Sequence, residues 1–68
     1  MQTKFFEADA FSGSKGAHLG DLESDYRWEK GDELWIDNGG KRTKIRVTWV
    51  NVTVKDGVVS REVLGLKL

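Results

Sequence analysis

The stretch from Arg42 to Lys55 constrains the fold of this chain more than any other segment, because its apolar side chains alternate and then change parity. They are Ile45, Val47 and Trp49 at odd positions, followed by Val50, Val52 and Val54 at even positions. A regular strand sends successive side chains to opposite faces, so it cannot keep both sets on one face. We therefore predict a long β-segment with a bulge or sharp bend near Trp49–Asn51, of the kind that lets a small sheet close on itself.

The rest of the chain is punctuated by glycine, with eight glycines and no proline. The runs Asn38-Gly39-Gly40 and Asp56-Gly57 favour tight hairpin turns, because their residues tolerate positive φ angles. Further strands are expected at residues 3–11, 33–37 and from Val58 onward, with a short 3₁₀ turn at 60–63 before a last strand at 64–68. No segment repeats its apolar residues with a helical period, so no long helix is expected.

The first expected strand has its better core-facing set at Phe6, Ala8 and Ala10. A polar segment follows from Ser12 to Asp25, and its length and three glycines predict a binding loop or a mobile loop. Leu19 and Leu22 would attach that loop to the body of the protein.

The whole chain, residues 1–68, is expected to fold as a single all-β domain, a small five-stranded, partly open barrel. It contains no cysteine, so disulfides cannot stabilise it, and hydrophobic packing or self-association must do so. It also has no leader-like N-terminal segment and no apolar run approaching the roughly 18 residues of a membrane span. We therefore expect a cytoplasmic protein with no membrane partner.

The segment DYRWEKGDEL, from Asp25 to Leu34, resembles the part of SH3 domains that leads through the diverging turn into the second strand. The matching residues are Asp25, Tyr26, Trp28, Lys30, Gly31, Asp32 and Leu34. The resemblance implies an SH3-like barrel, in which the loop carrying Asp21 and Glu23 takes the place of an acidic loop, and residues 60–63 that of a 3₁₀ turn. The tyrosines and proline that build the family's proline-binding groove are mostly missing here, which does not favour proline-motif binding.

Candidate catalytic and metal-binding groups are sparse. His18 is the only histidine, and the sequence shows no nucleophile or orienting group at a recognisable spacing from it. The carboxylates of Asp21, Glu23, Asp25 and Glu29 do not follow a calcium-loop pattern. We therefore expect no enzyme activity, no cofactor and no metal.

Charge is balanced overall but divided along the chain. Residues 1–37 contain nine acidic and four basic side chains, a net charge of −5, whereas residues 38–68 contain two acidic and seven basic ones, a net charge of +5. Arg42, Lys44 and Arg46 share one face of the long β-segment, and with Lys55 they could follow the phosphates of a nucleic acid. The zero net charge makes this the second expectation, because nucleic-acid-binding domains usually carry net positive charge.

The first expectation is protein–protein recognition by aromatic side chains. Three tryptophans exceed what a core of this size easily buries. Trp35 stands between Leu34 and Ile36 in an expected strand, so either Trp35 or its two apolar neighbours must face outward. The expected binding residues are Tyr26, Trp28, Trp35 and Trp49, with Asp21, Glu23, Asp25 and Glu29 selecting a basic or polar partner. A barrel of this size suits a regulator or inhibitor of a larger machine, such as a phage or mobile-element protein. A third expectation is a homo-oligomer subunit whose open edge strand pairs with a copy of itself.

Overall fold

The computed structural model describes all 68 residues, and every regular element in it is a β-strand. The strands are β1 (Gln2–Ala8), β2 (Lys15–Glu23), β3 (Glu33–Asn38), β4 (Lys41–Lys55) and β5 (Val58–Lys67). They form one sheet in the order β2-β1-β5-β4-β3, in which β1 and β5 are parallel and all other neighbours are antiparallel. The structure contains no helix that could cross a membrane.

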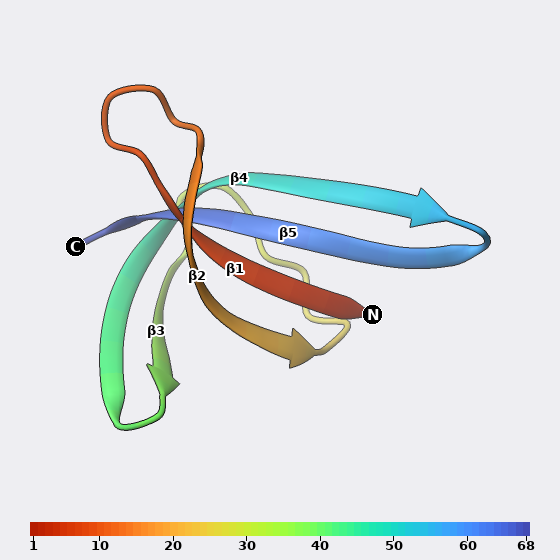
Figure 1. Cartoon of the computed structure of the whole chain (residues 1–68), viewed down its shortest axis with the longest axis horizontal. Coiled ribbons are helices and arrows are strands. Elements are labelled where there is room, and N and C mark those ends of the chain that lie inside the picture. Colours follow the sequence, from red (N-terminus) through yellow and green to blue (C-terminus); the bar gives the residue numbers. More distant parts are fainter.

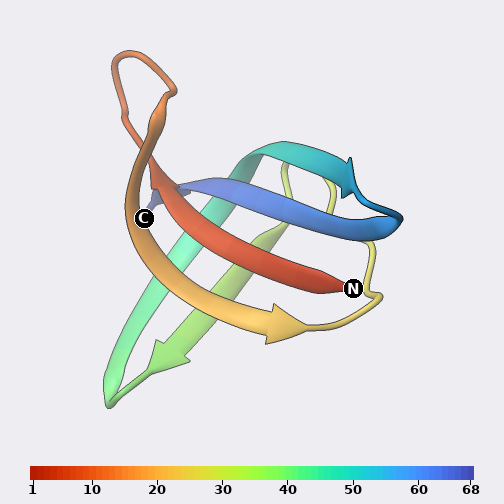
Figure 2. The same cartoon turned by 45° about the vertical axis from the view of Figure 1, so that its right-hand side comes forward.

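The sheet curls strongly, so that β1, β2 and β5 lie across β3 and the first half of β4 (Figure 1, Figure 2). The result is a half-barrel, which confirms the prediction of a small five-stranded all-β fold. Its shape is compatible with a small SH3-like barrel.

The bend in β4 comes from a β-bulge. In the pairing with β5, Val47 lies opposite Gly65 and Trp49 opposite Leu64, so Thr48 is an extra residue on β4. Ile45 and Val47 are buried, Trp49 is exposed, and Val50 packs against the core. The predicted bulge therefore exists, but it lies one residue before the expected range, because the inward alternation ends at Val47 rather than at Trp49.

The core lies inside the curl and is small. Phe5, Ile45, Val47 and Val63 form it, and Leu19, Trp28, Leu34, Ile36 and Val50 pack against it. The expected core face of the first strand, Phe6, Ala8 and Ala10, was right only at Ala8, since Phe5 is buried instead, Phe6 is half-buried and Ala10 is exposed. β1 ends at Ala8, so Ala10 lies outside the strand, and the pairing of β1 with β2 is irregular on both sides of Phe6.

Two further local predictions were wrong. Most of the expected loop from Ser12 to Asp25 is strand β2, which pairs antiparallel with β1. Residues 60–63 form a regular part of β5 instead of a 3₁₀ turn. At that point β5 is a central strand, with β1 hydrogen-bonded on one side and β4 on the other, and this pairing keeps it extended.

Both predicted hairpin turns are confirmed. Gly39 and Gly40 have φ angles of 62° and 82°, and Asp56 and Gly57 have φ angles of 51° and 75°. Two consecutive positive φ angles are the signature of a type I′ turn, whose twist matches that of the strands it joins.

The ends of β4 and β5 form a two-stranded projection that we call the arm, residues 49–60. Figure 1 shows it reaching beyond the other strands. It has only two strands at its tip because β3 pairs with β4 no further than Arg46, and β1 meets β5 only from Ser60 onward.

Candidate functional site

The two edge strands of the sheet, β2 and β3, approach each other and form a seam in the half-barrel. No strand ladder joins them. Instead, the side-chain amide of Asn38 donates a hydrogen bond from Nδ2 to the backbone oxygen of Leu19 over 3.1 Å. This contact divides the seam into two hollows. Residues of β2 before Gly20 line one hollow, and residues of β2 after Gly20 line the other.

The hollow beyond Gly20, which we call the aromatic hollow, has a volume of about 270 Å³. Its apolar lining is Phe5, Leu22, Trp28, Leu34, Trp35 and Ile36, and its polar lining is Asp21, Asp37 and Asn38. Apolar walls with a few polar groups are typical of binding sites in proteins.

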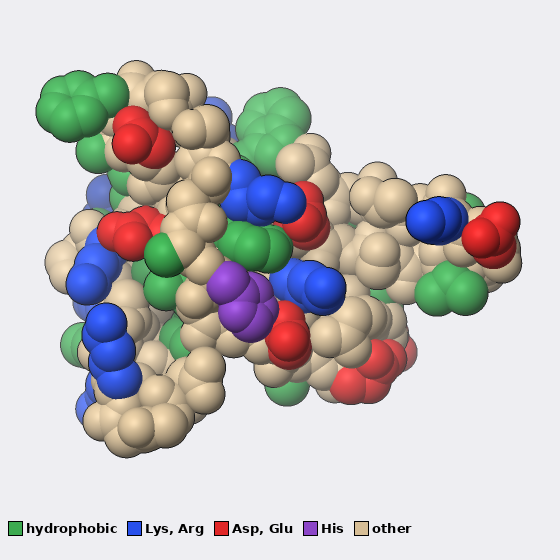
Figure 3. All heavy atoms as spheres, in the orientation of Figure 1, with side chains coloured by type: hydrophobic (Ala, Val, Ile, Leu, Met, Phe, Trp, Pro, Cys, Tyr) green, Lys and Arg blue, Asp and Glu red, His purple; other side chains and the backbone are tan.

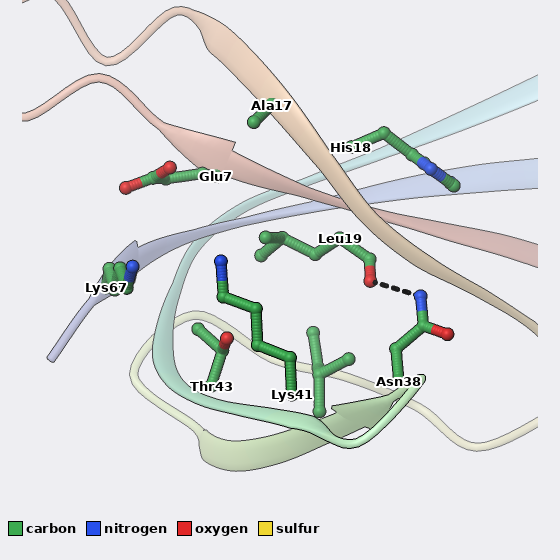
Figure 4. Close-up of a pocket in the computed structure, with 9 residues that line it drawn as sticks. Glu7, Ala17, His18, Leu19, Asn38, Lys41, Thr43 and Lys67 are labelled. Carbon is green, nitrogen blue, oxygen red and sulfur yellow. Dashed lines mark hydrogen bonds between the residues drawn. The ribbon is translucent and has the colours of Figure 1, made fainter.

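The other hollow has a volume of about 220 Å³ and is mainly polar (Figure 4). Its lining includes Glu7, Lys41, Thr43 and Lys67, and Figure 4 shows the Lys41 amine directed into it and the His18 ring turned away. Nowhere in the structure do three or more histidine or carboxylate side chains gather as a potential metal site.

Trp28 forms the inner wall of the aromatic hollow. Its ring packs edge-on against buried Phe5, with centroids 5.5 Å apart, and the centroid of the Tyr26 ring lies 4.4 Å from that of Trp28. The indole Nε1 of Trp28 is buried and has no hydrogen-bond partner. A buried donor without an acceptor costs about 1–3 kcal/mol.

Trp35 stands at the rim of the same hollow, and 53% of its surface is exposed. The Arg42 guanidinium lies 4.3 Å from the centre of the indole ring, and the Lys44 ammonium lies 5.6 Å from it. These cation–π contacts hold the ring in place while leaving half of its surface open.

The remaining predicted aromatic residue, Trp49, lies at the base of the arm and does not line the hollow. It is 57% exposed, and its Nε1 donates to Asn51 Oδ1 over 2.5 Å. Trp28 and Trp35 thus line the same hollow, and Tyr26 adjoins it by its contact with Trp28. Trp49 lies apart from all three.

The predicted acidic residues have different surroundings. Asp21 lines the hollow, and its Oδ1 lies 2.7 Å from His18 Nε2. Glu23 and Asp25 accept hydrogen bonds from the Met1 ammonium at 2.6 and 3.0 Å, and these bonds, with that of Glu23 foremost, raise the pKa of the ammonium above its ordinary value. Glu29 is exposed and forms no ion pair.

Sequence reasoning missed Asp37, which lines the hollow and forms no ion pair. Its signal was the alternation of β3, since Asp37 and Trp35 share one parity and therefore one face. The hydrophobic lining from β2 could not be found in the same way, because β2 was expected to be a loop.

The basic strip on β4 is largely paired with acidic residues. Arg42, Lys44 and Arg46 share the outward-facing parity, as predicted. Glu33, on the neighbouring strand, accepts from Arg46 Nη2 at 3.1 Å and from Lys44 Nζ at 3.2 Å. These two cations, with Arg46 foremost, hold the pKa of Glu33 below its ordinary value.

The fourth predicted basic residue, Lys55, is at the tip of the arm, far along β4 from the other three. Figure 3 shows acidic and basic side chains mixed over the middle of one face and on the arm, and basic side chains gathered over the first half of β4. Because Lys44 and Arg46 share Glu33 and Lys55 lies apart, the four predicted basic residues do not form one continuous track.

Comparison with known proteins adds no further assignment, since no protein-family model, curated protein sequence or solved structure matches this chain. The aromatic hollow combines an apolar wall and two carboxylates beside two free strand edges.

Proposed function

We propose that this protein is a non-catalytic, SH3-like binding module that recognises a partner protein at the aromatic hollow. The observation that carries the proposal is the convergence of Trp28 and Trp35 with the carboxylates of Asp21 and Asp37 around one opening. A basic side chain of an extended partner segment fits this chemistry, because its aliphatic stem would contact the indoles and its charged head the carboxylates.

The aromatic rings supply the affinity in this proposal. Trp28 is held by Phe5 and Tyr26, and Trp35 is held by Arg42, so neither ring has to be ordered when a partner binds. Rings that are fixed in advance lose little conformational entropy on binding, which is why such residues act as interface anchors.

The free edges of β2 and β3 add a means of binding the partner's backbone. Each strand pairs on one side only, so each carries unpaired backbone groups along the seam. An extended segment could form hydrogen bonds with one of these edges while it places a side chain in the hollow, as in other cases of strand addition.

The arrangement of charges favours a protein over a nucleic acid. Lys44 and Arg46 are paired with Glu33, and Arg42 covers Trp35, so the cations that would contact phosphates already have partners. The carboxylates at the hollow would repel a phosphate backbone. A nucleic-acid interface on β4 is therefore the weaker candidate.

The proposal can be tested with short extended peptides that differ only in a central arginine, lysine, alanine or glutamate. Binding is followed by the NMR signals of the indole N–H groups and of the β2 and β3 amides. We expect the arginine and lysine peptides to shift the Trp28 and Trp35 signals and the glutamate peptide to leave them unchanged.

Matched variants locate the site. Trp35→Ala should weaken binding of the arginine peptide by about 2 kcal/mol or more, as expected for an anchor. Trp49→Ala removes an equally exposed tryptophan outside the hollow and should leave the affinity unchanged. Equal losses in the two variants, or equal binding of the arginine and glutamate peptides, would refute the proposal.

A further inference from the structure

The outer edge of β4 is unpaired along the arm. β3 ends its pairing at Arg46, and the next contact is made by the turn before β3, where Gly31 N donates to Val47 O at 2.8 Å and Val47 N donates to Asp32 O at 2.7 Å. From Trp49 to Lys55, β4 is bonded only to β5. We propose that this edge pairs antiparallel with the same edge of a second copy of the chain, around a two-fold axis.

The arm lacks the usual protection of an edge strand. Such strands are blunted by prolines, charges or shortness, yet residues 49–55 contain no proline and only one charge, Lys55 at the end. Val52 and Val54 are 60% and 67% exposed, and Val58 and Val59 are exposed beside them. By contrast, the β2 and β3 edges are rich in glycine or acidic residues and lie along the seam.

The valines of the arm continue a core surface beyond the body of the protein. Val50 packs on the core, and Val52 and Val54 follow it at the same parity. Val59 lies opposite Val54 and therefore shares that face. This face has no cover at the tip of the arm, where the sheet is only two strands wide.

Symmetry favours a second copy as the partner. In an antiparallel pair with a two-fold axis perpendicular to the sheet, every residue lies opposite one of its own parity. The valine face of one copy therefore continues as the valine face of the other, without any requirement for a separately matched sequence. The chain also has zero net charge, so two copies do not repel each other overall.

The length of the free edge fixes the register. Pairing residues 49–55 with themselves in full places Val52 on the axis, facing its own counterpart. Val50 then faces Val54 of the second copy. On the other face, the Lys55 ammonium comes beside the exposed indole of Trp49 of the second copy, which is a favourable cation–π arrangement.

The contact is small compared with the roughly 800 Å² per partner of a standard interface, so we expect association that depends on protein concentration, with a dissociation constant on the order of micromolar. The wild-type chain should pass from monomer to dimer in sedimentation equilibrium as its concentration rises. A wild type that stays monomeric at millimolar concentration would overturn the proposal.

Charge at the axis provides the decisive test. Val52→Lys and Val52→Glu each place like charges opposite each other, and each should shift dimer formation to at least tenfold higher concentration. An equimolar mixture of the two should restore the dimer at wild-type concentrations. Arg61 of β5 lies opposite Val52, so circular dichroism must confirm that both variants fold, and Val52→Glu is the better tolerated of the two.

Val58→Lys is the matched control, since Val58 is equally exposed on the same arm but belongs to β5. It should dimerise like the wild type. Failure of the Lys and Glu mixture to recover, or equal effects at positions 52 and 58, would mean that another surface or another protein occupies the arm.

Cross-linking checks the register directly, because the chain has no cysteine of its own. Val52→Cys should form a disulfide-linked dimer on mild oxidation much faster than Val58→Cys, and equal rates would exclude the proposed axis. Binding of the arginine peptide should be unchanged in Val52→Lys. A result that refutes the proposed dimer can thus be distinguished from one that refutes peptide binding at the aromatic hollow.

Discussion

The guanidinium of Arg61 donates a hydrogen bond from Nε to Thr3 Oγ1 over 2.8 Å, and both residues are buried. A second nitrogen, Nη2, donates to the backbone oxygen of Ser24 at 3.2 Å. One side chain of β5 thereby links β1 with the segment that follows β2. This segment leads to Tyr26 and Trp28, so the buried arginine also supports one wall of the aromatic hollow.

We expect Thr3→Val to destabilise the fold by about 1–3 kcal/mol, because it keeps the size of the side chain but leaves a buried, charged donor without its acceptor. Urea unfolding followed by tryptophan fluorescence would measure the change. Thr53→Val makes the same substitution at an exposed position of the arm and should be close to neutral. Equal effects at the two positions would show that the Arg61 hydrogen bond does not stabilise the fold.

Gly65 is required by the close approach of β5 to the core. A Cβ atom at this position would lie 2.6 Å from Ile45 Cδ1 and 2.9 Å from Ile45 Cβ, and Ile45 is fully buried and cannot move aside. Gly65→Ala should therefore destabilise the fold by about 1–3 kcal/mol, as expected for overpacking.

Gly20→Ala is the control for Gly65→Ala. Its new Cβ would lie 3.5 Å from Ile36 Cγ2, which is an ordinary contact distance. The urea midpoint should change by the equivalent of about 0.5 kcal/mol or less. A tolerated Gly65→Ala would contradict the close packing of β5 on β4.

Much of the fold could be predicted from local pattern, because β4 and both hairpin turns have strong signals in the sequence. The parity change after Trp49 correctly indicated a bulge, yet its position depended on whether Trp49 or Val47 was the last inward residue. Alternation alone cannot decide this, since both are apolar. The answer lies in the pairing with Leu64 and Gly65.

Strand β2 could not be predicted because its own residues do not favour extended structure. Lys15–Glu23 contains two glycines and no β-branched residue. It is a strand because β1 offers it a hydrogen-bonding edge, and tertiary pairing overrides weak propensity. Missing β2 also concealed the seam. The sequence grouped Trp28, Trp35 and Asp21 in one expected binding face, but it could not show that β2 and β3 place them around one opening.

Glu33 should make the stability depend on acid pH. Its pKa is lowered in the folded state by Arg46 and Lys44, so its contribution is present above the unfolded pKa and is lost as the pH falls through the folded value. Glu33→Gln should thus be less stable than the wild type near neutral pH and equally stable at strongly acidic pH.

The measurement is urea unfolding at several pH values, and Glu29→Gln is the control because Glu29 forms no ion pair. Added salt should reduce the Glu33 difference, since the pair is exposed to solvent. A difference between Glu33→Gln and wild type that is constant from acid to neutral pH would rule out the ionic contribution.

Acrylamide quenching of tryptophan fluorescence can separate the two proposed surfaces in one experiment. Trp35 and Trp49 are more than half exposed, whereas Trp28 is largely covered. The double variant Trp35→Phe/Trp49→Phe, which keeps only Trp28, should therefore be quenched least. In Trp49→Phe, addition of the arginine peptide should reduce quenching of Trp35, because the peptide would cover the hollow.

In Trp35→Phe, a higher protein concentration should reduce quenching of Trp49, because a second copy would place Lys55 against it. Protection of Trp49 by the peptide, or of Trp35 by concentration alone, would show that the two surfaces have been assigned to the wrong partners.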